Sequence, residues 1–385
     1  MFKALSDAFF KELGEIKNSY YKLALLTLFP FTVFALMIAI FYQGVAFDLP
    51  INVVDNDKSE FSRKLLSNID ASSTIKIASE KFNTKDAIEE LQSSKVYGSI
   101  IIPAHFMRDT LLKKQPEVTA ILNTQYILIG KIFKAALIET VGGSAGVIEY
   151  VNDVSSSQNS TLARRSVTPI GLQITPFFNT YKNYFLFLVS ALLPAIWQIF
   201  IVIVTIVSFG TLFKEKREKE FFGSSYIASK IVGKLLPYTF VFTLMGAFLL
   251  LYFYGTLGWV FEGSFVVTIF GMFLTVVAYQ VVALFLFVTG FDYARSLSLG
   301  AVYTAPAFAF LGVTFPASDM NSFALFWRDL LPISYYMQIQ ISQSNYGVNV
   351  SMETSNLISI ALFTLVLIPV FFRFRQILAK KERNS

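Results

Sequence analysis

The stretch Thr304–Gln338, TAPAFAFLGVTFPASDMNSFALFWRDLLPISYYMQ, decides how the rest of this chain is interpreted. It begins as the end of an uncharged run suited to lipid, but two prolines and a glycine interrupt it, so one straight helix is not expected. After Pro316 the sequence changes to short amphipathic pieces. We therefore predict that residues 316–338 enter the membrane edge and return, because irregular backbone at that depth needs protein or water around it. An ordinary outer loop with interfacial aromatic residues is the open alternative.

This predicted outer re-entrant segment forms the lip, or outer gate, of a translocation route. Its assigned residues are Pro306, Gly312, Pro316, Met320, Trp327, Pro332 and Tyr335.

Composition places the chain in the membrane. Of its 385 residues, 54% are hydrophobic and only 15% are charged, whereas a soluble globular domain has about a quarter of its residues charged. There is no cysteine and one histidine, His105, which excludes disulfides and thiolate metal sites. The net charge of +6 is explained by cytoplasmic Lys and Arg rather than by nucleic-acid binding.

Uncharged runs predict an α-helical polytopic membrane protein with six transmembrane helices. Residues 1–22 are amphipathic and are expected to lie along the cytoplasmic membrane surface. Residues 23–43 form the first span, since 20 apolar residues cross a core about 30 Å thick. Residues 182–375 contain spans two to six, and 376–385 form a cytoplasmic tail.

A small extracytoplasmic α/β domain is predicted between spans one and two, at residues 44–181. Strand patterns such as INVVDND (Ile51–Asp57) and VYGSIIIP (Val96–Pro103) alternate with helical patterns. Asn83 or Thr84 is the expected cap of one helix. A long helix is predicted from Tyr126 to Val151, followed by a connection rich in Ser and Asn.

Lys and Arg residues set the predicted orientation. Sixteen of them flank the proposed cytoplasmic ends of the spans, against Arg328 alone in the two short outer loops. Both termini are therefore expected inside and the α/β domain outside.

The cytoplasmic loop at residues 214–234 is the candidate site for a partner. Its alternating charges suit a short solvent-facing helix, and two phenylalanines follow near water. We interpret it as a docking knob; a positively charged anchor beside lipid headgroups is the alternative. The residues assigned to this coupling loop are Lys214, Glu215, Arg217, Glu218, Glu220, Phe221, Phe222 and Lys234.

Catalytic motifs are missing from the sequence. There is no GxxxxGK[ST] nucleotide loop, no HExxH and no Ser-His-Asp set, and GGSAG (Gly142–Gly146) resembles a phosphate loop only superficially. No ionisable residue sits in the middle of an apolar run, as an ion-driven transporter would require. We therefore expect no enzyme activity and an energy source in another protein.

Three motifs carry a family resemblance. PAFAFLGVTFP (Pro306–Pro316), LLPISYYMQ (Leu330–Gln338) and GKLLPY (Gly233–Tyr238) resemble the permease subunits of ABC type-2 exporters. The similarity is strongest to the Gram-negative inner-membrane group that works with a periplasmic membrane-fusion adaptor. The stretch from Glu220 to Gly233 is shorter here than in many relatives, which makes the contact residues of the loop less certain than its role.

The resemblance implies a permease of the bacterial inner membrane that dimerises with a second copy or a paralogue. Two ATPase subunits would bind the coupling loop and carry ATP and Mg²⁺, while this chain binds no cofactor. Its other implied partners are the adaptor and membrane lipids. The many Phe residues of the spans suit either a hydrophobic or amphipathic substrate path or a lipid-facing surface. The alternative function is a membrane-anchored receptor or scaffold whose outer domain binds a protein.

Overall fold

The computed structural model describes residues 1–42, 47–112, 114, 116–123, 129–140, 183–217, 221 and 226–383. It divides into two compact units. Residues 1–44 with 177–385 form the helical unit, and residues 45–176 form the α/β unit. The GGSAG run and the predicted Ser- and Asn-rich connection lie outside the described residues, and the predicted long helix is described only over 129–140.

A four-stranded sheet in the order β2-β1-β3-β4 is the centre of the α/β unit. The strands are β1 (Leu49–Asp55), β2 (Ile75–Glu80), β3 (Gly98–Ile102) and β4 (Thr119–Leu122). β1 pairs in parallel with both β2 and β3, and β4 runs antiparallel to β3 at the edge. The α/β pattern predicted for this region is therefore present.

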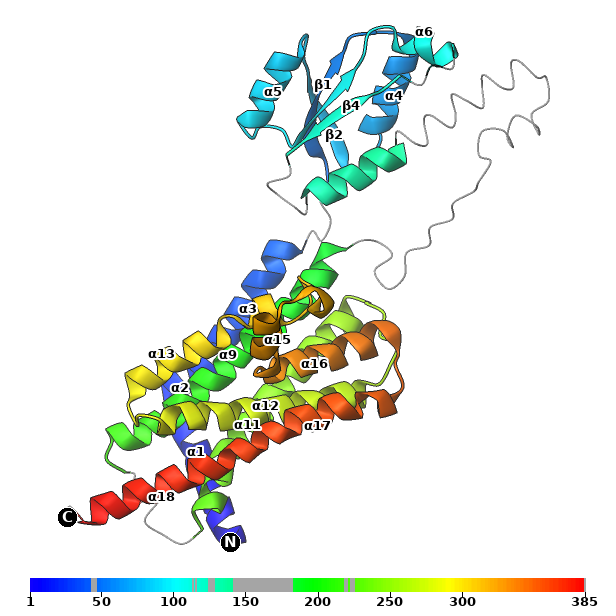
Figure 1. Cartoon of the computed structure of the whole chain (residues 1–385). Helices are drawn as coiled ribbons and strands as arrows, with labels where there is room; N and C mark the ends of the chain where they lie inside the picture. The colour runs from blue at the N-terminus through cyan, green and yellow to red at the C-terminus, as the bar shows by residue number, and fades with distance from the viewer. Residues whose placement is uncertain are drawn as a thin grey trace. The chain divides into compact units, whose positions relative to one another are not determined.

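Helices cover both faces of this sheet (Figure 1). They are α4 (Glu60–Asp70), α5 (Thr84–Gln92), α6 (Phe106–Leu111) and the helix at 129–140. Ile51 and Val53 of β1 pack with Leu65 and Ile69 of α4. Asn52 points the other way and donates to Ala87 O of α5 at 3.0 Å, as the alternation of a strand requires.

Within the described part of the chain, the helical unit contains five helices that are long and apolar enough to cross a membrane. They span Tyr20–Phe41, Phe185–Lys214, Ile227–Thr256, Phe265–Val288 and Val350–Gln376. Their elements are α2 (Tyr20–Leu26), α3 (Leu28–Phe41), α9 (Tyr184–Lys214), α11 (Ile227–Leu250), η1 (Leu251–Thr256), α12 (Phe265–Val288), η4 (Val350–Glu353), α17 (Thr354–Leu362), η5 (Phe363–Val366) and α18 (Leu367–Arg383).

The uncharged run Ser296–Ser318, which was predicted to be the fifth span, has a different form. It contains α13 (Tyr293–Thr304) and α14 (Ala307–Phe310), which are separated at Pro306. Proline ends α13 because it has no N–H to continue the helix and its ring restricts the residue before it. The chain is a multi-pass membrane protein, and a count of six spans stays a prediction.

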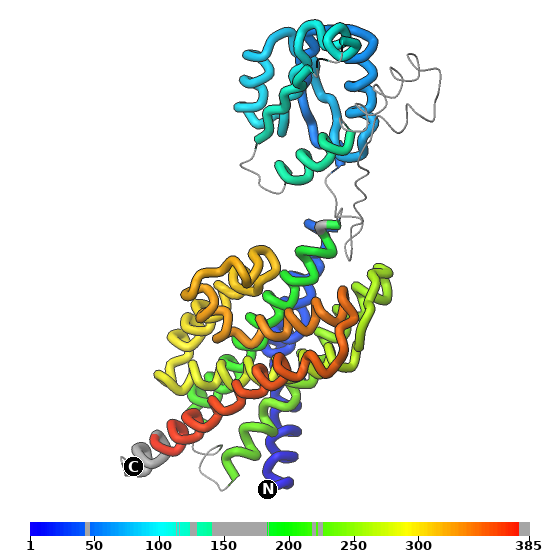
Figure 2. Tube along the Cα trace, turned by 45° about the vertical axis from the view of Figure 1, so that its right-hand side comes forward, coloured from blue at the N-terminus to red at the C-terminus, as the bar shows by residue number. Residues whose placement is uncertain are grey.

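Spans α9 and α12 lie in the centre of the helical unit. The most apolar window of each is 61% buried, against 17% for the last span. Figures 1 and 2 show α1 (Phe2–Asn18) and α18 at one end of this unit and the α14–α16 region at the other. The N-terminal helix and the outer segment thus occupy opposite ends of the same bundle.

Candidate functional site

The N-terminal helix α1 packs directly on α11. Its buried face carries Ala8, Glu12 and Ile16 at helical spacing, so an acid interrupts an otherwise small and apolar face. Gly233 of α11 permits the contact, because a Cβ at this position would lie 2.3 Å from the backbone oxygen of Leu5. The two helices therefore meet backbone to backbone.

A break at Ser19 separates α1 from α2 and brings a cation back toward α1. Ser19 has an extended backbone, and its hydroxyl accepts a hydrogen bond from Lys22 N at 3.3 Å, which caps α2. The side chain of Lys22 then donates to Glu12 and to Glu15, each at 2.9 Å.

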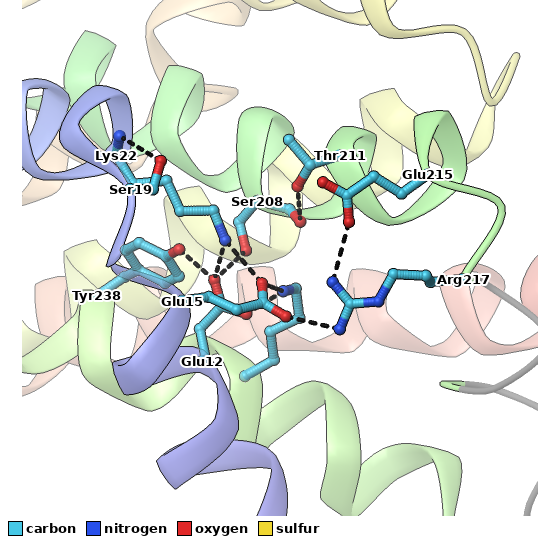
Figure 3. A network of polar contacts seen from close by, with 10 residues as sticks. Glu12, Glu15, Ser19, Lys22, Ser208, Thr211, Glu215, Arg217 and Tyr238 are labelled. Carbon is cyan, nitrogen blue, oxygen red and sulfur yellow. Dashed lines mark hydrogen bonds and ion pairs between the residues drawn. The ribbon is translucent and has the colours of Figure 1, made fainter. Parts of the chain in front are cut away.

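Glu12 is the centre of a buried polar network (Figure 3). Only 2% of its surface is exposed. Besides Lys22, it accepts hydrogen bonds from Lys234 and Tyr238 of α11 and from Ser208 of α9, the last at 3.2 Å. A buried carboxylate is stable only when paired and hydrogen-bonded, so these donors fix α1 against α2, α9 and α11 together.

Arg217 extends the network toward solvent. Its guanidinium donates to Glu15 at 2.8 Å and to Glu215 at 2.9 Å. Glu12, Glu15 and Glu215 thus face Lys22, Arg217 and Lys234, three acids against three bases. Each of the buried charges of Glu12, Lys22 and Lys234 has an opposite partner, which compensates part of the cost of its burial, whereas Glu215 is exposed.

The end of α9 aims Arg217 at this network. Lys216 has a φ of 56°, the left-handed conformation in which many helices end. The N–H of Lys216 bonds to Phe213 O at 3.2 Å, and the N–H of Arg217 bonds to Leu212 O at 2.9 Å. This Schellman motif turns the chain back toward α1. The short solvent-facing helix predicted for the charged run stays a prediction, because residues 218–220 lie outside the described residues.

The network also shifts the titration of its acids. Burial alone would raise the pKa of Glu12, but the charges of Lys234 and Lys22 lower it below its ordinary value. Burial likewise opposes ionisation of Glu15, and the hydrogen bond from Lys22 with the charge of Lys234 lowers its pKa to about 2. Hydrogen bonds to Glu215 and Glu15 raise the pKa of Arg217. All three groups are therefore charged at neutral pH.

A cleft of about 580 Å³ lies beside the network, between α1 and the two ends of the coupling loop. This volume is within the range of protein binding pockets. Its lining includes Lys3, Ala4, Asp7 and Lys11 of α1, Leu212 and Arg217 at the end of α9, and Phe221, Tyr226, Lys230 and Lys234. The N-terminal helix and the predicted coupling loop thus form one surface.

The residues assigned to the coupling loop differ in how exposed they are in the structure. Lys214 and Glu215 are exposed, and Arg217 lines the cleft. Phe221 is half-buried: its ring lies 6.3 Å from that of Phe209, and its carbonyl accepts from Lys230 at 2.9 Å. Phe221 is therefore a packed residue rather than a free apolar knob.

Lys234 requires a correction. Although it lines the cleft, the residue is only 1% exposed and its ammonium group is bound to Glu12, so it offers almost no surface to a partner. Glu218, Glu220 and Phe222 lie outside the described residues.

The N-terminal helix has one side exposed and one side buried against the protein, and its predicted position along the membrane surface stays a prediction. The apolar stripe predicted within residues 1–22 consists of Phe2, Leu5, Phe9, Leu13, Ile16 and Tyr20. Of these, Phe2, Leu13 and Tyr20 are exposed, at 83%, 45% and 92%, and so remain available to lipid. Ile16 of the same stripe is buried against the protein. The helix therefore has a protein-facing side that the periodicity of its apolar residues did not predict.

The outer segment folds as a series of short helices. They are α14, η2 (Ala317–Asp319), α15 (Ser322–Asp329) and α16 (Pro332–Ile341). Gly312 adopts a φ of +83° that suits glycine, Pro316 precedes η2, and Pro332 begins α16. Met320 is buried, and Trp327 and Tyr335 are half-buried. α14 and α15 each contact α16, so the predicted gate residues belong to one packed segment.

Glu12, Lys22 and Tyr238 are functional candidates that the sequence reasoning did not identify. Tyr238 lies 226 residues from Glu12 in the chain, and Lys22, ten residues from Glu12, reaches it because the helix breaks at Ser19. The sequence did contain one signal for a buried acid: Glu12 is four residues from both Ala8 and Ile16, so it lies on the same helix face as these two apolar residues.

The fold and the site define a multi-pass membrane protein with a charged cleft, and the described part of the chain holds no cluster of potential metal ligands. The model of the ABC-2 family transporter protein matches residues 23–373, and the chain belongs to this family. Members of this family are permease components of ABC transporters. No curated protein matches the chain.

Proposed function

We propose that this chain is the permease subunit of an ATP-driven ABC type-2 exporter and that separate ATPase subunits bind at the cleft. Membership of the family supports this proposal, since ABC-2 permeases generally work with ABC ATPases. The observation that carries it is the shared surface of α1 and the coupling loop. A partner that presses on this surface acts on α9 and α11 at once, because Arg217 and Lys234 belong to the network around Glu12 and Glu15.

The rest of the assembly follows from this role. ATP and Mg²⁺ belong to the ATPase partners, and this chain needs no cofactor of its own. Two permease copies, or this chain with a paralogue, form a conduit in the bacterial inner membrane for a hydrophobic or amphipathic substrate, with a periplasmic adaptor and lipids as further partners. Both termini face the cytoplasm, and the α/β unit and the α14–α16 gate lie on the periplasmic side.

A bulky substitution in the cleft tests the docking site. Ala4→Trp fills cleft volume on α1, while Lys17→Trp adds the same bulk at an exposed position of α1 that does not line the cleft. Each variant is expressed in the native host and purified from its membranes under gentle conditions, and the ABC ATPase that co-purifies with it is measured. Ala4→Trp is expected to lose the ATPase and substrate-stimulated ATP hydrolysis, and Lys17→Trp to retain both. Phe221 is a poor choice here because its replacement disturbs packing.

Full ATPase retention by Ala4→Trp, with normal export, contradicts docking at the cleft. If the wild-type chain purifies without an ATPase and its activity is insensitive to vanadate, the permease proposal itself is wrong. The receptor or scaffold interpretation then has to be preferred.

A further inference from the structure

Pro194 interrupts α9 inside the bundle. Proline has no N–H, so the carbonyl of Ser190, four residues earlier, loses its usual helical hydrogen bond. The side chain of Gln340 in α16 replaces this bond, because its Nε2 donates to Ser190 O at 2.9 Å. Replacement by a neighbouring helix is what makes a proline tolerable within a membrane span. The interrupted turn of α9 is therefore attached to α16.

A second bond of the same kind follows one turn after Pro194. Gln198 of α9 is fully buried, and its Nε2 donates to Thr304 O at 3.3 Å. Thr304 is the last residue of α13, and the final carbonyls of a helix have no partner within that helix. The end of α13 is therefore also attached to α9 through a glutamine side chain.

These two bonds hold the two ends of the outer segment. α13 precedes this segment and α16 is its last helix, and both contact α9. Ser190 lies about one turn before Pro194 and Gln198 about one turn after it, so the proline stands midway between the two attachments. A change in the bend of α9 at Pro194 consequently changes the separation of α13 and α16.

We propose that Pro194 is a hinge that controls the outer segment, with Gln198 and Gln340 attaching the two halves of α9 to its two ends. A proline turn bends at lower cost than a regular turn, because no backbone hydrogen bond has to be broken there. The half of α9 after the hinge is also held by α11, since the indole N–H of Trp197 donates to Phe242 O at 3.1 Å. The half before the hinge is the one that moves, and it carries α16 with it. This inference rests on the bonds around Pro194 and not on the proposed function.

Distances between two spin labels test the hinge, and the absence of cysteine from the chain makes introduced cysteines specific labelling sites. Val302→Cys in α13 and Tyr346→Cys in η3 (Ser342–Tyr346), which continues α16, are both exposed positions. The full chain is labelled in lipid nanodiscs and measured by pulsed electron paramagnetic resonance. Pro194→Ala is expected to narrow the distribution of label distances, because the restored N–H returns Ser190 O to its helical bond and stiffens α9.

Pro237→Ala is the matched control, because Pro237 also lies inside a span, α11, but not between the two attachments. It is expected to leave the distance distribution unchanged. An unchanged distribution in Pro194→Ala, or an equal narrowing in Pro237→Ala, overturns the hinge.

A double-mutant cycle tests the attachment by Gln340 independently. Gln340→Met keeps the size of the side chain but removes the amide, so it leaves Ser190 O without a donor and is expected to lower the unfolding temperature of the full chain. In the Pro194→Ala background the alanine N–H reaches Ser190 O, and the same substitution is expected to lower the unfolding temperature by less than half as much. Equal decreases in the two backgrounds show that Gln340 does not replace the missing bond of the proline, and they overturn the proposal.

Discussion

Replacing Glu12 by Gln should strongly destabilise the helical unit. The side chain is 2% exposed and accepts from Lys22, Lys234, Tyr238 and Ser208. Gln keeps the shape but removes the charge, which leaves three bases against two acids. Lys234 loses its only close ionic partner, because the nearest remaining carboxylate, that of Glu15, lies 4.0 Å from its ammonium group. Removing one partner of a buried ion pair costs about 3–5 kcal/mol, a large part of the roughly 5–15 kcal/mol by which proteins are stable.

Tryptophan fluorescence is a suitable assay because all three tryptophans, Trp197, Trp259 and Trp327, lie in the helical unit. A denaturant titration in mixed micelles then reports on this unit alone. The matched control is the double variant Glu12→Gln with Lys234→Met, which removes the unpaired cation. It is expected to recover at least half of the lost free energy of unfolding.

Two results would refute this reasoning. A loss below about 1 kcal/mol for Glu12→Gln is the size typical of a surface pair and not of a buried one. Additive effects of the two substitutions would show that Glu12 and Lys234 are not energetically coupled.

Three further outcomes follow from the local geometry. Lys216→Gly should raise the stability of the helical unit by about 1 kcal/mol in the fluorescence titration, because glycine adopts the left-handed backbone without steric cost; a decrease contradicts this. Glu15 has a pKa lowered from 4.5 to about 2, so its contribution is present above pH 4.5 and lost as the pH falls toward 2. Glu15→Gln should therefore show an acid loss of stability smaller by about 1–2 kcal/mol, after allowance for solvent screening; equal losses reject the assignment. Ser62→Ala removes a buried hydroxyl that donates a hydrogen bond to Asp55 at 2.7 Å. This change should lower the unfolding free energy of the α/β unit by about 1–3 kcal/mol, measured by hydrogen exchange of the backbone amides in its strands.

The elements that local chemistry controls could be predicted from the sequence. Asn83 caps α5 as expected, with its side chain accepting from Asp86 N at 2.8 Å. Period-two and apolar patterns identified the strands of the α/β unit, because each strand is decided by a few neighbouring residues. Pro306 was sufficient to predict a break in the fifth apolar run.

The network around Glu12 could not be predicted in the same way. An acid on an amphipathic helix is normally solvated, and only the fold brings Lys22 and Lys234 to it. The apolar stripe of α1 was a misleading guide because Phe2 and Leu13 are exposed while Glu12 is buried. For the same reason Lys234 was assigned to a surface that its side chain does not reach.

Gly233 gives the contact between α1 and α11 an unusual mechanical character. Most helix pairs touch through side chains, which rotate between rotamers and so absorb small displacements. At Gly233 the backbone of α11 lies against the backbone of Leu5, and the only side chain at the contact is the short methyl group of Ala8. Such a contact is rigid, so a movement of α1 is transmitted directly to α11. A larger residue at position 233 would separate the two backbones and make the contact more flexible.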